Sequence, residues 1–552
     1  MDSKRLVIFI LISLGLLLVW DKYVVPKQTA TATEVASSQT AAISSTEIPS
    51  TKSNNQISGD AAVLKNDKMI TVTTDTLQAE ISAIGGDLRS VNLIKHGSLK
   101  NIKQPFELLY NNNNKVFIAQ TGLVNNIGII LPTHNTVFTP DKYNYVLTPD
   151  QKKLTVSLKA IESGIEVIKS YTFSRDSYTV DVNYQIINNT SLPLTGVSAY
   201  WRLLRDETAP DGETMFVHTF TGPAYYTSDA KFNTVKFSDV AKGDISYPDT
   251  TTNGWIGYIQ HYFTAMWLLN AYNHNPVCAN GVGCRLNFKQ VGNLASAGFL
   301  TDLPTIKPNS SYGVTVPLFI GPQDHKILTT TAPQLELTKD YGFVYIFATP
   351  LFWLLVKLYE FVKNWGWAII LLTVVVKMVL YPLTRASYIS MAKMKALAPK
   401  LEALKAQCGD DRAKLQKSMM ELYKSEKVNP IGGCLPMILQ IPVFIGLYWA
   451  LLSSVELRQA SFLWVHDLSL PDPYYILPVI LAITMFLQTY LNPPPTDPVQ
   501  AKMMKIMPVA FSVMFFFFPA GLVLYWLVNN ILSIAQQWYV NNHVTLRRKN
   551  RN

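Results

Sequence analysis

The chain has 552 residues, of which 48% are hydrophobic, and its mean hydropathy is +0.14. This composition excludes a single ordinary soluble domain and leaves room for a soluble part and several membrane spans. The formal net charge of +10 does not require DNA as a partner, because most of the basic excess lies beside apolar segments. Four cysteines in this length exclude a disulfide scaffold, and no Cys/His cluster has metal-ligand spacing, so we expect no metal and no cofactor.

The N-terminal segment 1–25 contains an apolar run over 6–20 between charged flanks. No small-x-small cleavage site follows this run, so we predict an uncleaved transmembrane anchor rather than a signal peptide. Residues 26–59 are rich in Ser, Thr and Ala and have no hydrophobic periodicity. That composition predicts a flexible tether.

Residues 60–340 have the period of half-buried strands. Tyr178, Val180, Val182, Tyr184 and Ile186 alternate with polar residues, and Asn-Asn, Pro-Asp and Gly-Gly pairs separate similar segments. No long helical pattern interrupts them. We therefore predict a mostly antiparallel β-sandwich for this domain.

Two cysteines of this domain, Cys278 and Cys284, flank an Asn-Gly turn and are close enough to bridge. If the domain lies outside the cytoplasm, a disulfide between them is the favoured interpretation. Two small buried thiols are the alternative.

The apolar stretch over 350–383 is too long for one span, since as a single helix it would measure about 50 Å against a hydrocarbon core of about 30 Å. Lys357, Glu360 and Lys363 fall on one helical face, so we predict an interfacial amphipathic helix over 345–364. Trp365 and Trp367 then mark the outer boundary of a second span over 365–384.

The segment 385–428 is polar, and its basic residues outnumber its acidic ones. It has two apolar stripes, separated by Gly409 as a helix stop and Asp410 as an N-cap. We predict a basic helical hairpin, which the positive-inside rule places in the cytoplasm.

Four further spans are predicted over 429–545, the first opened by Asn429-Pro430 and the last two separated at Pro519. A basic cytoplasmic tail follows over 546–552. Six spans satisfy the alternation of basic loops, with both termini in the cytoplasm and the β-domain outside.

Lys377 lies within the second span, and no acidic residue lies within any predicted span to pair with it. An intramembrane ammonium without a carboxylate favours a hydrated groove, and snorkelling to the interface is the alternative. The other polar residues of the spans have two interpretations: they line the same groove, or they form hydrogen bonds between helices. The polar residues in question are Thr373, Gln440, Gln488, Asn529, Asn530, Gln536 and Gln537.

Five segments carry a family resemblance: YPLTRASYISMAKMKALAPK, EKVNPIGGCLPMILQIPVFIGLYWAL, SVELRQASF, DPYYILPVI and FPAGLVLYWLVNN. They resemble the YidC/Oxa family of membrane-protein insertases, and most closely its Gram-negative YidC type. The strong match covers 350–545. The resemblance implies a polytopic α-helical protein of the bacterial inner membrane, with a five-helix core and a large, super-sandwich-like periplasmic domain.

The family also implies a hydrophilic groove, open to cytoplasm and lipid, with one cationic residue. Carried onto this sequence, that residue is Lys377, where the bacterial pattern usually has arginine; the charge is kept but the five-donor fork is lost. The resemblance implies Thr373, Tyr525 and Trp526 as further groove residues. Gln440, a polar residue between Pro436 and Pro442 of an apolar span, is a further groove candidate from its own position. Trp526 stands where the family has a second tyrosine, so an aromatic wall remains without its hydroxyl.

By this resemblance the chain is expected to insert and help fold nascent inner-membrane proteins, alone or with the Sec translocon. The hairpin 385–428 would meet arriving substrate or the ribosome, and the lipid bilayer is a further partner. No catalytic residues are expected, and no P-loop is present, so the chain is not expected to be an enzyme.

Two other classes compete with this interpretation. A small-solute transporter would show inverted repeats, and we find no similarity between the spans. An envelope enzyme would place its chemistry in the β-domain, whose histidines fall in no recognisable site motif. They are His96, His134, His218, His261, His274 and His325.

Overall fold

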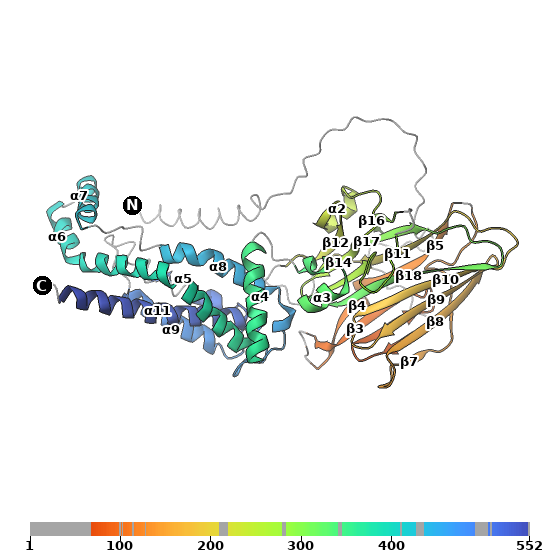
Figure 1. Ribbon diagram of the computed structural model, residues 1–552, viewed down its shortest axis with the longest axis horizontal. Helices are drawn as coiled ribbons and strands as arrows, with labels where there is room; N and C mark the ends of the chain where they lie inside the picture. Colours follow the sequence, from red (N-terminus) through yellow and green to blue (C-terminus); the bar gives the residue numbers. More distant parts are fainter. Residues whose placement is uncertain are drawn as a thin grey trace, which may run out of the picture. The chain divides into compact units, whose positions relative to one another are not determined.

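The computed structural model describes residues 68–98, 101, 103–112, 115–126, 128–208, 219–278, 283–339, 345–408, 411–426, 435–491, 506–507 and 511–549. The predicted anchor over 1–25 and the tether over 26–59 lie outside these residues, as do Asp410 and Asn429. The chain divides into two compact units, one within the segment before residue 341 and the other within the segment after it (Figure 1). The first unit contains the two sheets and the second the long helices.

One nine-stranded sheet has the order β16-β17-β11-β5-β4-β3-β2-β1-β7. Its pairs are antiparallel except β1 with β7, which is parallel. The strands are β1 Met69–Thr73, β2 Leu77–Ser82, β3 Leu88–Gly97, β4 Pro105–Asn112, β5 Lys115–Asn125, β7 Asn144–Val146, β11 Val197–Arg205, β16 Arg285–Val291 and β17 Leu294–Asp302.

The other nine-stranded sheet has the order β13-β12-β14-β15-β18-β10-β9-β8-β6. All of its pairs are antiparallel. The strands are β6 Thr139–Pro140, β8 Lys153–Glu162, β9 Ile165–Ser174, β10 Thr179–Asn188, β12 Gly222–Thr227, β13 Lys231–Thr234, β14 Trp255–Gln260, β15 Phe263–Leu268 and β18 Ser310–Pro322. Two short helices, α2 Phe237–Lys242 and α3 His325–Thr331, accompany the sheets.

The predicted all-β domain is confirmed. Val180, Val182, Tyr184 and Ile186 are fully buried on β10, and β9 alternates buried and half-buried residues along its whole length, as a strand with one face in the core must. The central strand β11 does not alternate, because all its residues are buried. Tyr184 of β10 and Trp201 of β11 meet edge to face between the sheets.

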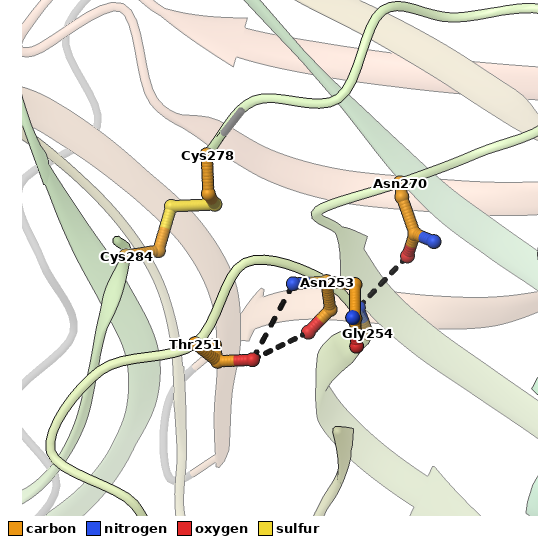
Figure 2. Close-up of a disulfide and its surroundings, with 6 residues drawn as sticks. All are labelled: Thr251, Asn253, Gly254, Asn270, Cys278 and Cys284. Atoms are coloured by element: carbon orange, nitrogen blue, oxygen red, sulfur yellow. Dashed lines mark hydrogen bonds between the residues drawn. A yellow bond between two sulfur atoms is a disulfide. The ribbon is translucent and has the colours of Figure 1, made fainter. Parts of the chain in front are cut away.

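Cys278 and Cys284 are joined by a disulfide and are buried (Figure 2). Cys284 directly precedes β16, and its backbone exchanges two hydrogen bonds with Thr251, of 2.7 and 2.8 Å. Two residues later, the carbonyl of Asn253 accepts from the Thr251 hydroxyl at 2.8 Å. The disulfide therefore fixes the residue that directly precedes β16, and the backbone hydrogen bonds of Cys284 join this point to the segment just before β14.

Removing this disulfide is expected to loosen β16. A disulfide that closes so short a loop stabilises the folded state by about 2 kcal/mol, because it reduces the conformational entropy of the unfolded chain. The Cys278→Ala, Cys284→Ala double variant should lower the opening free energy of Arg285–Val291 by about that amount, measured by hydrogen–deuterium exchange of the full-length protein. Cys408→Ala, which removes a free cysteine of the helical unit, is the control and should leave this segment unchanged. Equal exchange in all three proteins would contradict the prediction.

The helical unit contains α4 Tyr345–Val362, α5 Trp365–Ala396, α6 Ala398–Cys408, α7 Arg412–Ser425, α8 Leu435–Leu452, α9 Ile476–Leu491 and α11 Ala520–Lys549. The break between α4 and α5 has a local cause. Lys363 has a left-handed φ of 54°, and the Asn364 side chain caps α5 by accepting from the Trp367 amide at 3.2 Å.

Two details differ from the sequence-based prediction. Helix α5 continues through Pro382 and past 385 to Ala396, so the second span and the first arm of the hairpin form one helix. A single proline removes one helical hydrogen bond, and no glycine follows it to stop the helix. The N-cap of α7 is Asp411, which accepts from the Lys414 amide at 3.0 Å, and not the predicted Asp410. Both neighbouring aspartates have the required side chain, so composition alone does not separate them.

By length and composition, two of the described helices are long and apolar enough to cross a membrane, namely α4 and α5. Shorter apolar helical stretches lie at Gln440–Leu452 and Ile476–Thr489. Helix α4 carries an exposed ion pair between Lys357 and Glu360 at 2.7 Å. The interfacial role of α4 and the count of six spans stay predictions.

Candidate functional site

Helix α11 runs beside α5 and α9 and also contacts α8 (Figure 1). Its polar side chains form hydrogen bonds with three neighbouring helices, α5, α8 and α9. Ser533 and Gln536 bond to α5, whereas Asn530 donates to Thr484 of α9 at 2.9 Å. The candidate site is built between α11 and α5, on a group of residues that we call the polar seam: Lys377, Thr384, Asn529, Ser533 and Gln536.

Lys377 is half-buried, and its Nζ donates to the Ser533 hydroxyl at 2.7 Å. The Ser533 hydroxyl donates in turn to the Asn529 carbonyl, also at 2.7 Å. Further along the seam, the Gln536 amide donates to the Thr384 hydroxyl at 2.8 Å. Within the described part of the chain, no ion pair involves Lys377. The ammonium therefore keeps an uncompensated positive charge between two helices.

Thr373 lies one turn before Lys377 on α5 and is buried. Its hydroxyl donates to the Ile369 carbonyl of its own helix at 2.7 Å, which is a common arrangement for threonine in apolar helices. This places Thr373 on the packed side of α5, beside the lysine along the chain but without a hydrogen bond to it.

The other predicted groove residues form a second group. The Gln440 amide of α8 donates to the Tyr525 hydroxyl of α11 at 2.7 Å, and Tyr525 is buried. Trp526 packs edge to face on Phe444, with ring centroids 4.3 Å apart. Tyr525 precedes Ser533 by about two helical turns, so the structure brings Gln440 to Tyr525 and leaves Lys377 further along α11.

A folded loop covers the N-terminal start of α11. The amides of Ala520 and Gly521 donate to the carbonyls of Leu470 and Leu468, at 2.8 and 2.9 Å. Asp472 is buried and accepts from the indole of Trp464 at 3.1 Å and from the Leu477 amide at 2.7 Å. These hydrogen bonds fasten the loop that contains Leu468–Leu470 to the first turn of α11.

Ser533 and Thr384 were not singled out from the sequence. Helical periodicity carries a signal for Ser533, because it follows Asn529 by four residues and Tyr525 by eight and so continues one polar face. No local sequence signal indicates that Lys377 is the partner of Ser533, since the two residues lie 156 positions apart along the chain.

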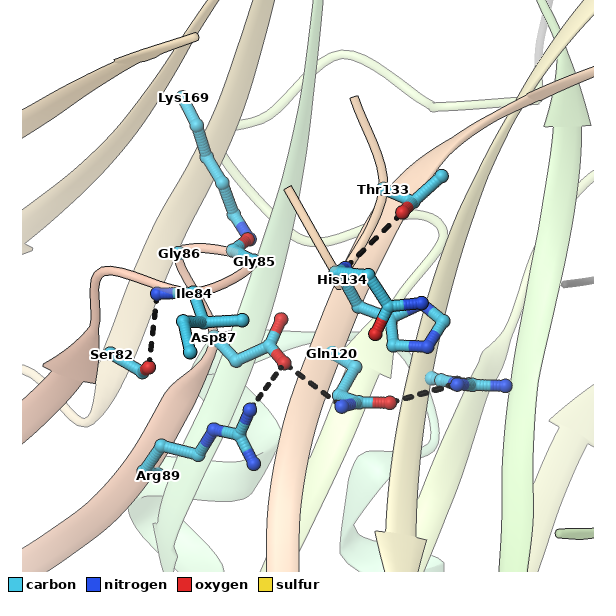
Figure 3. Close-up of polar contacts among 12 residues, drawn as sticks. Ser82, Ile84, Gly85, Gly86, Asp87, Arg89, Gln120, Thr133, His134 and Lys169 are labelled. Atoms are coloured by element: carbon cyan, nitrogen blue, oxygen red, sulfur yellow. Dashed lines mark hydrogen bonds and ion pairs between the residues drawn. The ribbon is translucent and has the colours of Figure 1, made fainter. Parts of the chain in front are cut away.

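The β-domain holds a second polar group, which sequence reasoning also missed (Figure 3). Asp87 Oδ2 accepts from Arg89 at 3.2 Å and from Gln120 at 2.9 Å, and Gln120 Oε1 accepts from Arg202 at 2.8 Å. Lys169 of the other sheet donates to the Gly85 carbonyl at 2.9 Å. We use the name inter-sheet charge cluster for six residues: Asp87, Arg89, Gln120, His134, Lys169 and Arg202. All of their side chains are buried.

Burial dominates the titration of this cluster. Desolvation raises the pKa of Asp87 against the pull of Arg89, and it lowers the pKa of Lys169 to about 7. Desolvation, with repulsion from Arg202, Arg89 and Lys169, lowers the pKa of His134 to about 3. Cationic groups outnumber the one carboxylate here, so the neutral imidazole avoids a further buried charge.

Acidification is expected to destabilise the β-domain through His134. The unfolded chain takes up a proton near pH 6.5, whereas the native imidazole stays neutral down to about pH 3. The unfolded state thus binds more protons in this window, and stability falls as the pH falls through it, by several kcal/mol for this group. His134→Asn, which retains an acceptor for the 2.7 Å contact with the Tyr200 hydroxyl, should have a flatter profile between pH 6.5 and 4.

The measurement is hydrogen–deuterium exchange of β5 and β11 in the full-length protein at several pH values. Wild type and His134→Asn share every other titrating group, so their difference isolates the imidazole. Parallel pH profiles for the two proteins would contradict the prediction.

Two family models match the chain. The family described as 60Kd inner membrane protein matches residues 357–548, and the family described as YidC periplasmic domain matches residues 69–354. Together they span both structural units.

Curated relatives match over nearly the whole chain. A protein of Laribacter hongkongensis named Membrane protein insertase YidC is 54% identical over 547 residues, covering 99% of this chain and 98% of the relative. A protein of Neisseria meningitidis serogroup C with the same name is 46% identical over 564 residues, covering 99% of each. A solved structure titled "Active YidC insertase crystal structure with the first transmembrane domain resolved" has a TM-score of 0.39 and 19% identity, covering 87% of this chain and 95% of that one.

Proposed function

The chain belongs to the YidC family of membrane protein insertases, and from this premise we propose that it inserts nascent membrane proteins through a groove built around the Lys377 ammonium. Insertion is not an enzymatic reaction, and relatives of full length bear the name of an insertase, so the transporter and the envelope enzyme raised by the sequence are set aside. The observation that carries the proposal is a half-buried lysine whose partner is a neutral serine at 2.7 Å.

The uncompensated charge supplies the attraction. At an effective dielectric constant of about 20, a carboxylate about 4 Å from an ammonium gains about 4 kcal/mol. A short polar or acidic tail of a nascent protein is therefore drawn part of the way across the apolar layer. The apolar helix behind that tail then partitions into lipid, at about 0.3–0.6 kcal/mol per large apolar residue.

The remaining groove residues shape the path. Gln440 and Tyr525 supply a hydrogen-bonded polar pair, and Trp526 supplies an aromatic surface. Thr373 is buried one helical turn before the cation and lies beside it on α5. The loop hydrogen-bonded to the start of α11 supports closure at the outer end. Lipid access is supported by α9, where every exposed side chain that the structure describes is apolar: Ile476, Val479, Ile480, Ile483, Phe486 and Leu487.

The partners of the groove follow from charge. Helices α6 and α7 form the basic hairpin, in which Lys400 pairs with Glu426 at 2.5 Å. The exposed lysines of α7, which are Lys414, Lys417 and Lys424, are the proposed contacts to the ribosome. The Sec translocon is the second proposed partner. The proposed topology has six spans in the bacterial inner membrane, cytoplasmic termini and a periplasmic β-domain, as the positive-inside rule requires.

The test is complementation of cells depleted of their own insertase. A single-span protein with an acidic N-terminal tail is the client, and protease added outside spheroplasts reports tail translocation. We expect this chain to restore translocation. Failure at wild-type expression, with the chain in the inner membrane, would overturn the proposal.

A further inference from the structure

We propose that Ser533 is a positioning residue for the insertion cation: its hydroxyl holds the Lys377 ammonium in the polar seam and keeps it from swinging out to the lipid-facing side of α5. The contact is direct, at 2.7 Å between Nζ and Oγ. This inference rests on the proposed function for its biological meaning, but the contact can be tested without it.

The hydroxyl has one proton and two lone pairs, and the proton is already used. It is donated to the Asn529 carbonyl, one turn earlier on α11, at 2.7 Å. One lone pair of Ser533 therefore accepts from the lysine as a fixed acceptor, and the other is left for the Tyr388 hydroxyl of α5, which also hydrogen-bonds to this serine. Because the side chain is buried and tied to its own helix, it does not follow a moving ammonium.

Lys377 lies at an edge where such an acceptor matters. Thr373, one turn earlier, is buried, whereas the two residues after the lysine, Met378 and Val379, are 63% and 73% exposed. The four-carbon stem can thus point either into the seam or along the exposed face. The serine contact selects the seam, and it leaves two of the three ammonium N–H groups for a carboxylate of the translocated tail.

Ser533→Ala removes the acceptor with little change in volume. Ser533→Thr retains it, because threonine makes the same bond to the carbonyl four residues earlier. The matched control is Thr384→Val, which removes the 2.8 Å contact with Gln536 across the same two helices and leaves Lys377 untouched. All variants are compared at equal membrane abundance.

The first readout is the reactivity of the Lys377 amine. Full-length protein in lipid vesicles is acetylated with acetic anhydride between pH 7 and 10, and the Lys377 peptide is quantified by mass spectrometry. Hydrogen bonds to a charged group are strong enough that the pH profile of Ser533→Ala should shift by about one unit. The profiles of Ser533→Thr and Thr384→Val should coincide with that of wild type. An unshifted Ser533→Ala profile overturns the proposal, and so does an equal shift in Thr384→Val.

The second readout is insertion of the client with an acidic tail in insertase-depleted cells. We expect a loss of about tenfold for Ser533→Ala and rescue to within about twofold by Ser533→Thr. If the amine profile shifts but neither Ser533→Ala nor Lys377→Ala affects insertion, the positioning contact stands and the proposed groove function fails. If Ser533→Thr inserts as poorly as Ser533→Ala, the serine acts through packing and the positioning role is overturned.

Discussion

Replacing Lys377 by glutamate or alanine is expected to reduce insertion of a client with an acidic tail at least tenfold, about the effect of losing 1.4 kcal/mol of attraction. Glutamate should be the worse of the two, because it repels the tail. Lys377→Arg should insert at or near the wild-type level, since the charge is the property in use. Protease protection of the client tail in insertase-depleted cells is the measurement.

A second client separates charge from general damage to the fold. A tail with its acidic residues replaced by serine gains little from the ammonium, so its insertion should fall far less in Lys377→Ala. Lys357→Ala removes an exposed lysine, paired with Glu360, from the same helical unit and is the control variant. If Lys377→Ala inserts both clients as well as wild type does, the lysine only extends its ammonium to the membrane interface. Insertion then depends on the hairpin and on the other polar residues of the groove.

The parts of this molecule that could be predicted from sequence are those with a repeating pattern. The period-two burial of Val180, Val182 and Tyr184 identified the β-domain, and long apolar runs identified the helices. Local signals were less certain. Two adjacent aspartates near residue 410 offered two N-caps, and Pro382 could have ended α5 but did not.

Contacts between distant segments could not be predicted, because they follow no local period. The sequence identifies Lys377 as an isolated charge in an apolar run. Its partner Ser533 is identified only in the structure, where α5 packs on α11. The inter-sheet charge cluster is a stronger case. Gln120 and Arg202 face each other across β5 and β11, and Lys169 reaches the cluster from the other sheet.

Asp87→Asn is expected to destabilise the β-domain by about 3–5 kcal/mol, the usual cost of removing one partner of a buried ion pair. The amide keeps the shape of the side chain but leaves the buried guanidinium groups of Arg89 and Arg202 without a carboxylate. Opening free energies of β3 and β5, from hydrogen–deuterium exchange of the full-length protein, are the measurement. Asp150→Asn, on an exposed turn, is the control and should leave both strands unchanged.

The neighbouring turn shows why the site cannot relax around a lost charge. Gly85 and Gly86 have left-handed φ values of 73° and 58°, and a Cβ on Gly85 would lie 2.5 Å from the His134 carbonyl oxygen. Lys169 and Tyr171 fasten the two glycine carbonyls from the opposite sheet, at 2.9 and 2.5 Å. Asp87 follows directly, so its position is set by the backbone on both sides.

The pH dependence of the Asp87→Asn effect distinguishes a charge imbalance from a lost hydrogen bond. The native pKa of Lys169 is about 7, so this lysine is cationic at pH 6 and neutral at pH 9. Attraction to Asp87 raises this pKa, so the pKa of Lys169 falls further in the Asp87→Asn variant. Between pH 9 and pH 6 the wild-type lysine regains its proton in the folded state, whereas the variant lysine resists protonation and the unfolded chain does not. The destabilisation should therefore be larger at pH 6, whereas a lost hydrogen bond to Gln120 alone would cost the same at both. Equal losses at the two pH values would mean that the cluster holds the sheets together by geometry and that its charges are balanced by other means.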